Sequence, residues 1–173
     1  MPGFKIGTGS GETPNVVETR RKHRWKFTAI SGTLLEQKLC ILLMSASRPH
    51  VTIEEAEMHH NQEKVFFAGK HTWEPITLVW YDTTGDGGGG DVTSGVWDWL
   101  NACVVIPSAS VETPNTYKKD SELQSLDGMG GALETWNLYG CWPQDVNWSD
   151  LDYSNNEIQK VECVMRYDRA EKA

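Results

Sequence analysis

The chain has no long apolar segment of the kind that crosses a membrane. Its longest uninterrupted apolar run, Leu39–Met44, is six residues long, whereas a membrane span needs about 20. The first residues also lack the apolar core of a secretory signal. We therefore expect no membrane partner and a chain that starts in a cytoplasm.

The sequence also has few signs of catalytic or metal-binding chemistry. It contains no GxSxG nucleophile motif, and its glycine run Gly87–Gly90 lacks the Lys-Ser/Thr pair that closes a phosphate loop. His59 and His60 are neighbours, so on a strand they point to opposite faces and only one of them can share a metal site with His71. We expect no catalytic residue, no metal and no cofactor.

The four cysteines are far apart in the sequence and form no CxxC pair, which excludes a zinc ribbon or a thioredoxin motif. We expect reduced thiols that pack as small hydrophobic side chains. Two disulfides remain an alternative for a protein that ends up outside a cell. These cysteines are Cys40, Cys103, Cys141 and Cys163.

Positive charge is scarce outside the first 26 residues. The formal net charge is −8, yet residues 1–26 contain six Lys or Arg against two Glu, so the remainder is strongly acidic. Because nucleic-acid affinity comes mainly from neutralised phosphates, an acidic body argues against DNA or RNA binding as its purpose. The basic cluster Arg20, Arg21, Lys22 and Arg24 belongs to a solvated or subunit-contacting arm, with a nuclear or nucleic-acid signal as the alternative.

A length of 173 residues is typical of one domain. Residues 1–24 are rich in Gly, Thr and Pro and then basic, which indicates an N-terminal arm, and residues 25–173 are expected to form a single domain. Short segments rich in β-branched and aromatic residues predict an antiparallel, mainly β architecture. The predicted strands are Trp25–Ile30, Lys38–Ser45, Val51–Met58, Lys64–Ala68, Ile76–Asp82, Ala132–Gly140 and Ile158–Tyr167.

One helix of about ten residues is predicted between two long loops. Ser94 can cap its start, Asp98 lies in its first turn, and Pro107 ends it. The loops are expected at Thr84–Asp91 and Ser108–Gly131. The apolar stripe of the helix consists of Val96, Leu100, Cys103 and Val104.

The strand patterns predict which faces are buried. In the last strand Val161, Cys163 and Met165 alternate with polar residues, so one face is expected in the core. In Val51–Met58 the apolar positions change phase, which a β-bulge near Glu54 and Glu55 explains. That strand is expected to bend and to carry an acidic face.

Two predicted strands are apolar or aromatic on both faces, at Ile76–Tyr81 and Thr135–Tyr139. A small antiparallel domain rarely covers both faces of a sheet, so we expect another subunit to supply the second cover. Trp80 and Trp136 are the interface candidates in these strands.

Tryptophan is the most unusual feature of the composition, with eight in the chain. Core and subunit-interface positions are the favoured interpretation. A carbohydrate-binding module is the alternative of a different class, since exposed aromatic faces stack on sugars. The tryptophans considered for that role are Trp73, Trp80, Trp136, Trp142 and Trp148.

The C-terminal half carries a distinctive series of short motifs. In order, these are Trp142-Pro143, Asp152-Tyr-Ser-Asn-Asn-Glu157 and Arg166-Tyr-Asp168. Together with the stretches 47–60 and 67–78, they resemble the tail tube proteins of contractile-tailed bacteriophages, the T4-like tube family. The resemblance covers most of residues 47–83 and 133–169, but not the arm or the glycine-rich tip.

The resemblance implies a non-enzymatic structural protein of the virion tail, made in the host cytoplasm. The implied fold is an antiparallel β-barrel or sandwich with one flanking α-helix. Six copies would form a ring, and stacked rings would form a hollow tube for DNA. The implied partners are further copies, the tail sheath, the baseplate or tube initiator, and the tape measure protein.

An acidic lumen would repel phosphates and let DNA pass without sequence-specific binding. We expect some or all of Glu54, Glu55 and Glu57 to face the bore, and Arg20, Arg21, Lys22 and Arg24 to contact an acidic neighbour or the sheath. A tube subunit of a related contractile injection system is the nearest alternative function.

Overall fold

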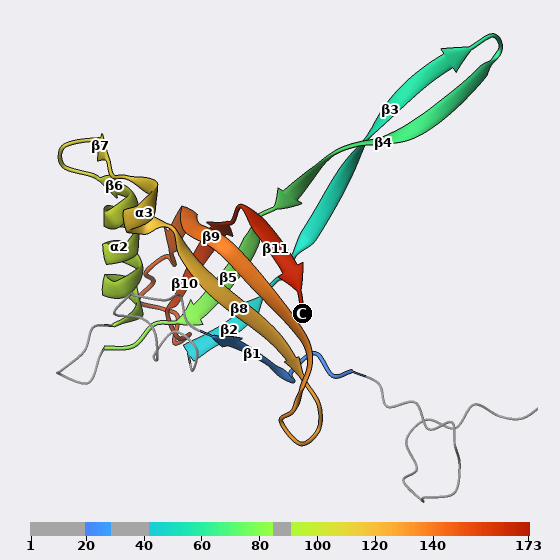
Figure 1. Ribbon diagram of the computed structural model, residues 1–173. Helices are drawn as coiled ribbons and strands as arrows, with labels where there is room; N and C mark the ends of the chain where they lie inside the picture. The colour runs from blue at the N-terminus through green and yellow to red at the C-terminus, as the bar shows by residue number, and fades with distance from the viewer. Residues whose placement is uncertain (1–19, 29–41, 85–90) are drawn as a thin grey trace, which may run out of the picture.

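The computed structural model describes residues 20–28, 42–84 and 91–173. Residues 1–19 of the predicted arm, Cys40 and the glycine run Gly87–Gly90 lie outside this part of the chain. The described residues form a mainly β body from which one long hairpin projects (Figure 1). The strands are β1 (Trp25–Thr28), β2 (Leu43–Ala46), β3 (His50–His60), β4 (Glu63–Glu74), β5 (Ile76–Tyr81), β6 (Val104–Val105), β7 (Ser110–Val111), β8 (Lys119–Leu126), β9 (Ala132–Trp148), β10 (Lys160–Arg166) and β11 (Arg169–Lys172).

The body is an antiparallel sandwich built around one continuous path of strands. Their order is β1-β8-β9-β10-β5-β2, and β11 pairs with β9 beside this path. The described strands do not close into a barrel, because β1 and β2 remain at the two ends of the path. The predicted fold class, an antiparallel β-barrel or sandwich, is confirmed as a sandwich.

Alternating apolar side chains bury one face of β5 and one face of β10 in the core. Ile76, Leu78 and Trp80 of β5 are completely buried, while the residues between them are half-buried. In β10 the predicted inward face is confirmed, since Val161, Cys163 and Met165 are also buried. A period of two places these side chains on one face of each strand.

Strand β9 links the two halves of the sandwich. Its first part pairs with β8 and β11 and its last part with β10. The sequence predicted an end at Gly140, but the strand continues to Trp148. Gly140 has φ +66°, a left-handed conformation that glycine adopts freely, so it bends the strand without ending it.

The predicted helix is present as α2 (Val92–Cys103), and a short helix, α3 (Pro114–Tyr117), follows it. Asp91, and not Ser94, caps α2, because its side chain accepts a hydrogen bond from the Ser94 backbone N–H. Asp98 consequently lies beyond the first turn. The buried side of the helix is Val92, Val96, Trp99 and Cys103, whereas Val104 has left the helix and is exposed.

The predicted loop Ser108–Gly131 is wrong in its second half, which contains β8. This strand is polar in sequence, yet Ser121 and Leu123 are buried in the body. The Ser121 hydroxyl satisfies its buried position by a 3.3 Å hydrogen bond with the Cys141 thiol.

Three cysteines, Cys103, Cys141 and Cys163, are free and buried, as predicted for thiols that pack as small hydrophobic groups. Burial raises the pKa of Cys103 to about 11, and of Cys141 and Cys163 to about 12. These thiols are therefore poor nucleophiles.

Within residues 20–28, 42–84 and 91–173, the helices are too short or too polar to span a bilayer. The same residues contain no group of three or more His, Cys, Asp or Glu arranged to hold a metal ion.

Candidate assembly surfaces

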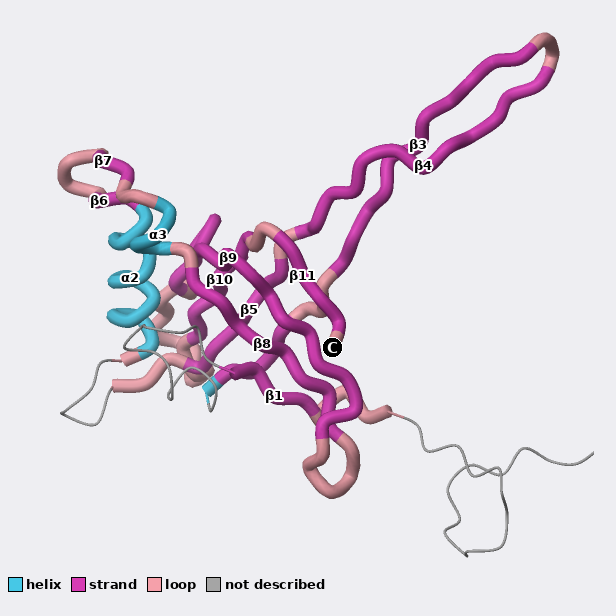
Figure 2. Tube along the Cα trace, viewed as in Figure 1, coloured by secondary structure: helices cyan, strands magenta, loops and turns pink. Residues whose placement is uncertain are grey.

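The hairpin formed by β3 and β4 stands away from the body over most of its length (Figures 1 and 2). Strands of 11 and 12 residues extend for about 35 Å, and every residue of β3 is exposed. A two-stranded hairpin by itself is at best marginally stable in water. Such a hairpin needs a second surface to cover it.

Trp73 fastens the base of the hairpin to the body. Its ring centroid lies 5.9 Å from that of Tyr167, which is buried, and Trp73 itself packs against the core. Val51 is directly opposite Trp73 across the hairpin, so both side chains lie on the same face. The apolar face of the base thus continues the core outward.

A change of strand register lies at the predicted position beside Glu54. Ile53 pairs with His71 and Glu55 pairs with Ala68, so two residues of β4 face one residue of β3. The extra residue is therefore in β4, whereas the sequence had suggested a bulge in β3. A Cβ at Gly69 would lie 2.9 Å from the Glu54 carbonyl oxygen, which explains glycine at this close approach.

Beyond this bulge the apolar side chains lie on the opposite face. Cross-strand pairing places them together as an exposed cluster, which we call the apolar stripe. Met58 is 51% exposed and Phe67 is 53% exposed. The apolar stripe consists of Ala56, Met58, Val65 and Phe67.

The three candidate lumen residues do not share one face. Glu55 and Glu57 lie two residues apart and point to the same side, while Glu54 points to the side of the apolar stripe. Glu57 is held by Lys64, whose Nζ lies 3.1 Å from a carboxylate oxygen, and His59 lies 3.6 Å from the same oxygen. The acidic face is therefore composed of Glu55 and Glu57.

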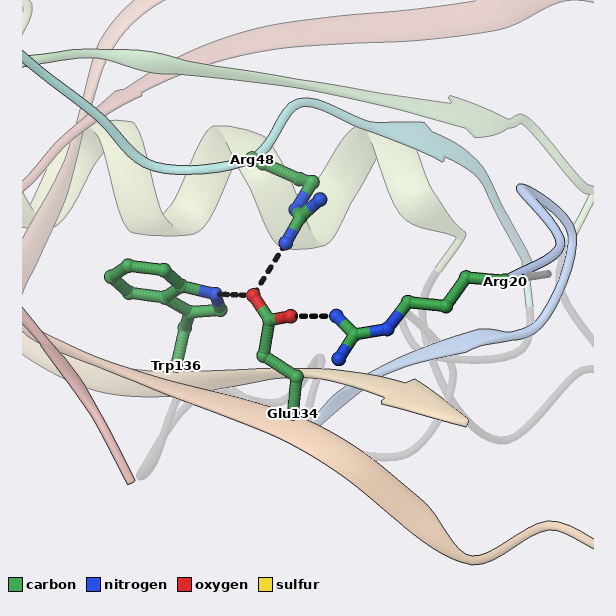
Figure 3. A network of polar contacts seen from close by, with 4 residues as sticks. All are labelled: Arg20, Arg48, Glu134 and Trp136. Atoms are coloured by element: carbon green, nitrogen blue, oxygen red, sulfur yellow. Dashed lines mark hydrogen bonds and ion pairs between the residues drawn. The ribbon is translucent and has the colours of Figure 1, made fainter. Parts of the chain in front are cut away.

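A second surface is organised around Glu134 near the start of β9. Figure 3 shows Arg20, Arg48 and Trp136 converging on its carboxylate. Arg20 contacts one oxygen and Arg48 the other, and Trp136 donates its indole N–H at 2.6 Å. The Glu134 side chain is only 3% exposed.

These contacts keep Glu134 ionised. The hydrogen bond from Trp136 is the largest cause of a lowered pKa, the two arginines add to it, and burial opposes it, which leaves a value of about 2. The cluster joins Arg20, the segment before the hairpin and the body. It therefore ties Arg20 and the segment before the hairpin to one strand.

A pocket of about 390 Å³ surrounds this cluster, which we call the basic pocket. Its lining has five cationic side chains against one carboxylate, that of Glu134. Apolar walls are contributed by Trp25, Ala46, Leu123 and Trp136. The cations are Arg20, Arg21, Lys22, Arg24 and Arg48.

The structure brings together five of the six residues considered for subunit or sheath contacts, since Arg20, Arg21, Lys22, Arg24 and Trp136 all line the basic pocket. The prediction of an interface role for the sixth residue, Trp80, is wrong. Its side chain is 0% exposed in the core and has no surface for a partner. Its alternation with Tyr81 places Tyr81, and not Trp80, on the outer side.

Sequence reasoning missed Arg48 and Glu134. Glu134 contacts arginines 114 and 86 residues away, and no local pattern connects such positions. The clustering of Arg20, Arg21, Lys22 and Arg24 was visible because these residues are adjacent in sequence.

A third surface is the loop 149–159 between β9 and β10, which we call the acidic loop. Its two ends are joined by a hydrogen bond from the Ser149 N–H to the Lys160 carbonyl, 3.1 Å long. Leu151 is 80% exposed, and Tyr153 is fully exposed. The loop contains Asp150, Asp152 and Glu157 and no Lys or Arg.

The sequence of this chain is similar to those of known structural proteins. Residues 37–171 match the family of the T4-like virus tail tube protein gp19. The chain belongs to this family. The predicted resemblance is confirmed, and the protein is a tail tube subunit, a structural component of a contractile tail.

The tail tube protein of Serratia phage KSP90 is 23% identical to this chain over 158 residues, which cover 87% of each protein. The tryptophans fit the same conclusion, because most pack in or against the core instead of forming a sugar-binding platform. The carbohydrate-binding alternative is therefore wrong.

Solved structures of contractile injection systems share the fold. A chain of the tube terminating cap of the anti-feeding prophage has a TM-score of 0.71 at 17% identity, and the match covers 95% of this chain and 97% of the cap chain. A chain from the sheath-tube complex of the PVC extracellular contractile injection system has a TM-score of 0.67 at 19% identity, with coverage of 90% and 91%. A chain of the 6-fold symmetrised baseplate of the anti-feeding prophage has a TM-score of 0.62 at 16% identity, with coverage of 94% and 97%.

Proposed function

We propose that six copies of this tail tube subunit close into a ring, and that stacked rings form a hollow conduit for phage DNA. The observation that carries this proposal is the β3–β4 hairpin. Its length, its exposed apolar stripe and its two uncovered faces require a neighbouring surface. A second copy supplies that surface in a homo-oligomer without any further protein.

Sixfold symmetry is supported by the similar fold of the baseplate chain described as 6-fold symmetrised. In a closed ring each subunit contacts its two neighbours through two different patches, so both patches of every subunit are covered. The sheath and the baseplate or tube initiator are the proposed outer and terminal partners, in line with the sheath-tube complex named above. A tape measure protein would occupy the tube before DNA.

The proposed bore is acidic. Glu55 and Glu57 share one face of the hairpin and are the strongest candidates to line it, with Glu54 the candidate if the opposite face turns inward. A carboxylate-lined bore repels phosphates, so DNA passes without sequence-specific binding. The virion tail is then the site of function, after synthesis in the host cytoplasm, and no catalysis is required.

The bore is tested by replacing its candidate carboxylates with lysine. Tubes of the E55K/E57K variant are expected to retain duplex DNA in a low-salt pull-down, whereas wild-type tubes release it. The matched control is E162K/E171K, which makes the same change of charge on the body. Equal DNA retention by both variants would show that Glu55 and Glu57 are not in the bore.

Assembly is tested by negative-stain microscopy and sedimentation of the purified full chain. Rings or hollow rods are expected, and class averages of end views should have six subunits. A chain that stays a single copy at high concentration would contradict the proposal.

A tube subunit of a related contractile injection system is the second candidate function, favoured by the shared fold of the solved structures. Capsid genes beside the gene for this chain would decide for the phage.

A further inference from the structure

The basic pocket and the acidic loop lie at opposite ends of β9. Glu134, at the centre of the pocket, is the third residue of this strand, and the loop begins directly after Trp148, its last residue. The hydrogen bond between Ser149 and Lys160 holds the loop at that far end. No described residue of the acidic loop lines the basic pocket of its own chain.

Among the described residues, the lining of the pocket has more cationic side chains than carboxylates to pair with them. Arg20 and Arg48 are engaged by Glu134, and Arg24 lies close to Asp127. Arg21 and Lys22 are exposed and make no ion pair with the described residues. The Glu134 carboxylate already has three donors, and no ion pair joins it to Arg21 or Lys22.

The acidic loop has the complementary chemistry. Asp150 and Glu157 make no side-chain hydrogen bond or ion pair within the described chain. Asp152 accepts hydrogen bonds from the backbone and side chain of Ser154, which lower its pKa and keep it ionised. These contacts fix the shape of the loop without using its other two carboxylates.

The apolar residues of the acidic loop also match those of the basic pocket. Leu151, Tyr153 and Ile158 are 80%, 112% and 64% exposed, a large apolar surface for one short loop. The basic pocket offers aromatic walls in Trp25 and Trp136, on which a tyrosine ring can pack. An aromatic anchor surrounded by opposite charges is typical of a protein interface.

We infer that the acidic loop of one copy docks in the basic pocket of the next copy of this chain. The contact is head-to-tail, because loop and pocket are different patches at opposite ends of β9, and repetition of such a contact around a rotation axis closes a ring. This inference rests on the proposed function, in which copies assemble. It also assigns a role to the motif Asp152–Glu157, which forms the centre of the loop.

Disulfide trapping of the full chain tests the contact directly. The R21C and D150C variants are prepared separately, mixed in equal amounts and oxidised. A crosslinked dimer is expected in the mixture and not in either variant alone, and the chain carrying both substitutions should give a ladder of higher multimers. The wild-type chain controls for its own cysteines, of which Cys103, Cys141 and Cys163 are buried.

Reversal of charge provides a second test. R21E/K22E and D150K/E157K are each expected to reduce the assembled fraction by at least tenfold, and the chain with all four substitutions should recover most of it. The D98K/E112K variant, which changes charge by the same amount as D150K/E157K on exposed parts of the body, should assemble as the wild type does. Unchanged thermal unfolding of each variant shows that the body is folded.

The two proposals fail in different ways. If wild-type rings or rods form but no crosslink appears and the fourfold variant does not recover, the loop–pocket contact is wrong and the tube function stands. If wild-type copies never assemble, the tube proposal fails, while a crosslink in the mixture would still support a loop–pocket contact between two copies.

Discussion

In the body, β5 buries Ile76, Leu78 and Trp80 completely, whereas in the hairpin every residue of β3 is exposed. Both regions are antiparallel sheet, and both carry apolar residues in alternation. In the body these apolar residues are buried within one chain, because the strands of the sandwich and α2 cover one another. Within the part of the chain that the structure describes, the hairpin has no such cover, so its sequence is suited to an assembled state.

The largest effect on the isolated chain is expected in the body. Trp80→Ala removes a fully buried side chain, so the free energy of unfolding should fall by about 3–5 kcal/mol. Urea unfolding followed by circular dichroism measures this change. A loss below about 1 kcal/mol would contradict the description of Trp80 as a core residue.

A smaller effect is expected at Glu134, where the body holds Arg20 and Arg48. Glu134→Gln removes the charge that Arg20 and Arg48 share, and should cost about 2 kcal/mol at neutral pH. Because folding lowers the pKa of Glu134 from 4.5 to about 2, its contribution is complete above pH 4.5 and is lost as the pH falls toward 2.

The difference in unfolding free energy between wild type and Glu134→Gln should therefore shrink between pH 5 and pH 2. Glu162→Gln, an exposed position of β10, is the matched control and should show no such difference at neutral pH. A gap between wild type and Glu134→Gln that is independent of pH would contradict an ionised, arginine-bound Glu134.

The hairpin should respond locally to a change at its bulge. Gly69→Val places a side chain against the Glu54 carbonyl and should destabilise the hairpin by about 1 kcal/mol while the body stays folded. Limited proteolysis should then cut within residues 50–74 faster than in the wild type. Thr72→Val, at a regular position of the same strand, should not change the rate.

The smallest effect on the isolated chain is expected at the apolar stripe. Phe67→Ser removes an exposed side chain and should change the stability of the single copy by less than about 0.5 kcal/mol, yet it should prevent assembly. Val111→Ser, at an exposed apolar position outside the hairpin, is the control and should assemble normally. Normal tubes from Phe67→Ser would show that the stripe is not an interface.

The body was largely predictable because apolar alternation marks its central strands. The period-two patterns of Ile76–Tyr81 and Lys160–Arg166 were clear, and both strands are found. Strand β8 was missed because serine occupies an inward position, where Cys141 satisfies its hydroxyl. The predicted strands ended at Ala68 and Gly140, whereas Gly69 and Gly140 permit a bulge and a bend within strands that continue.

The candidate site was predictable only where its residues are neighbours in sequence. The arginines of the arm stood out as a cluster, but their carboxylate partner Glu134 lies 114 residues beyond Arg20. Trp80 was assigned to an interface because its strand is apolar on both faces, and the burial of its own face could not be known without the fold.

Hydrogen–deuterium exchange of the dilute single copy and of the assembled particle is the most direct test that neighbouring copies complete the hairpin. The backbone amides of β5 and β10 should be protected in both states, and those of β3 and β4 only in the particle. Equal, strong protection of the hairpin amides in the single copy would contradict this account.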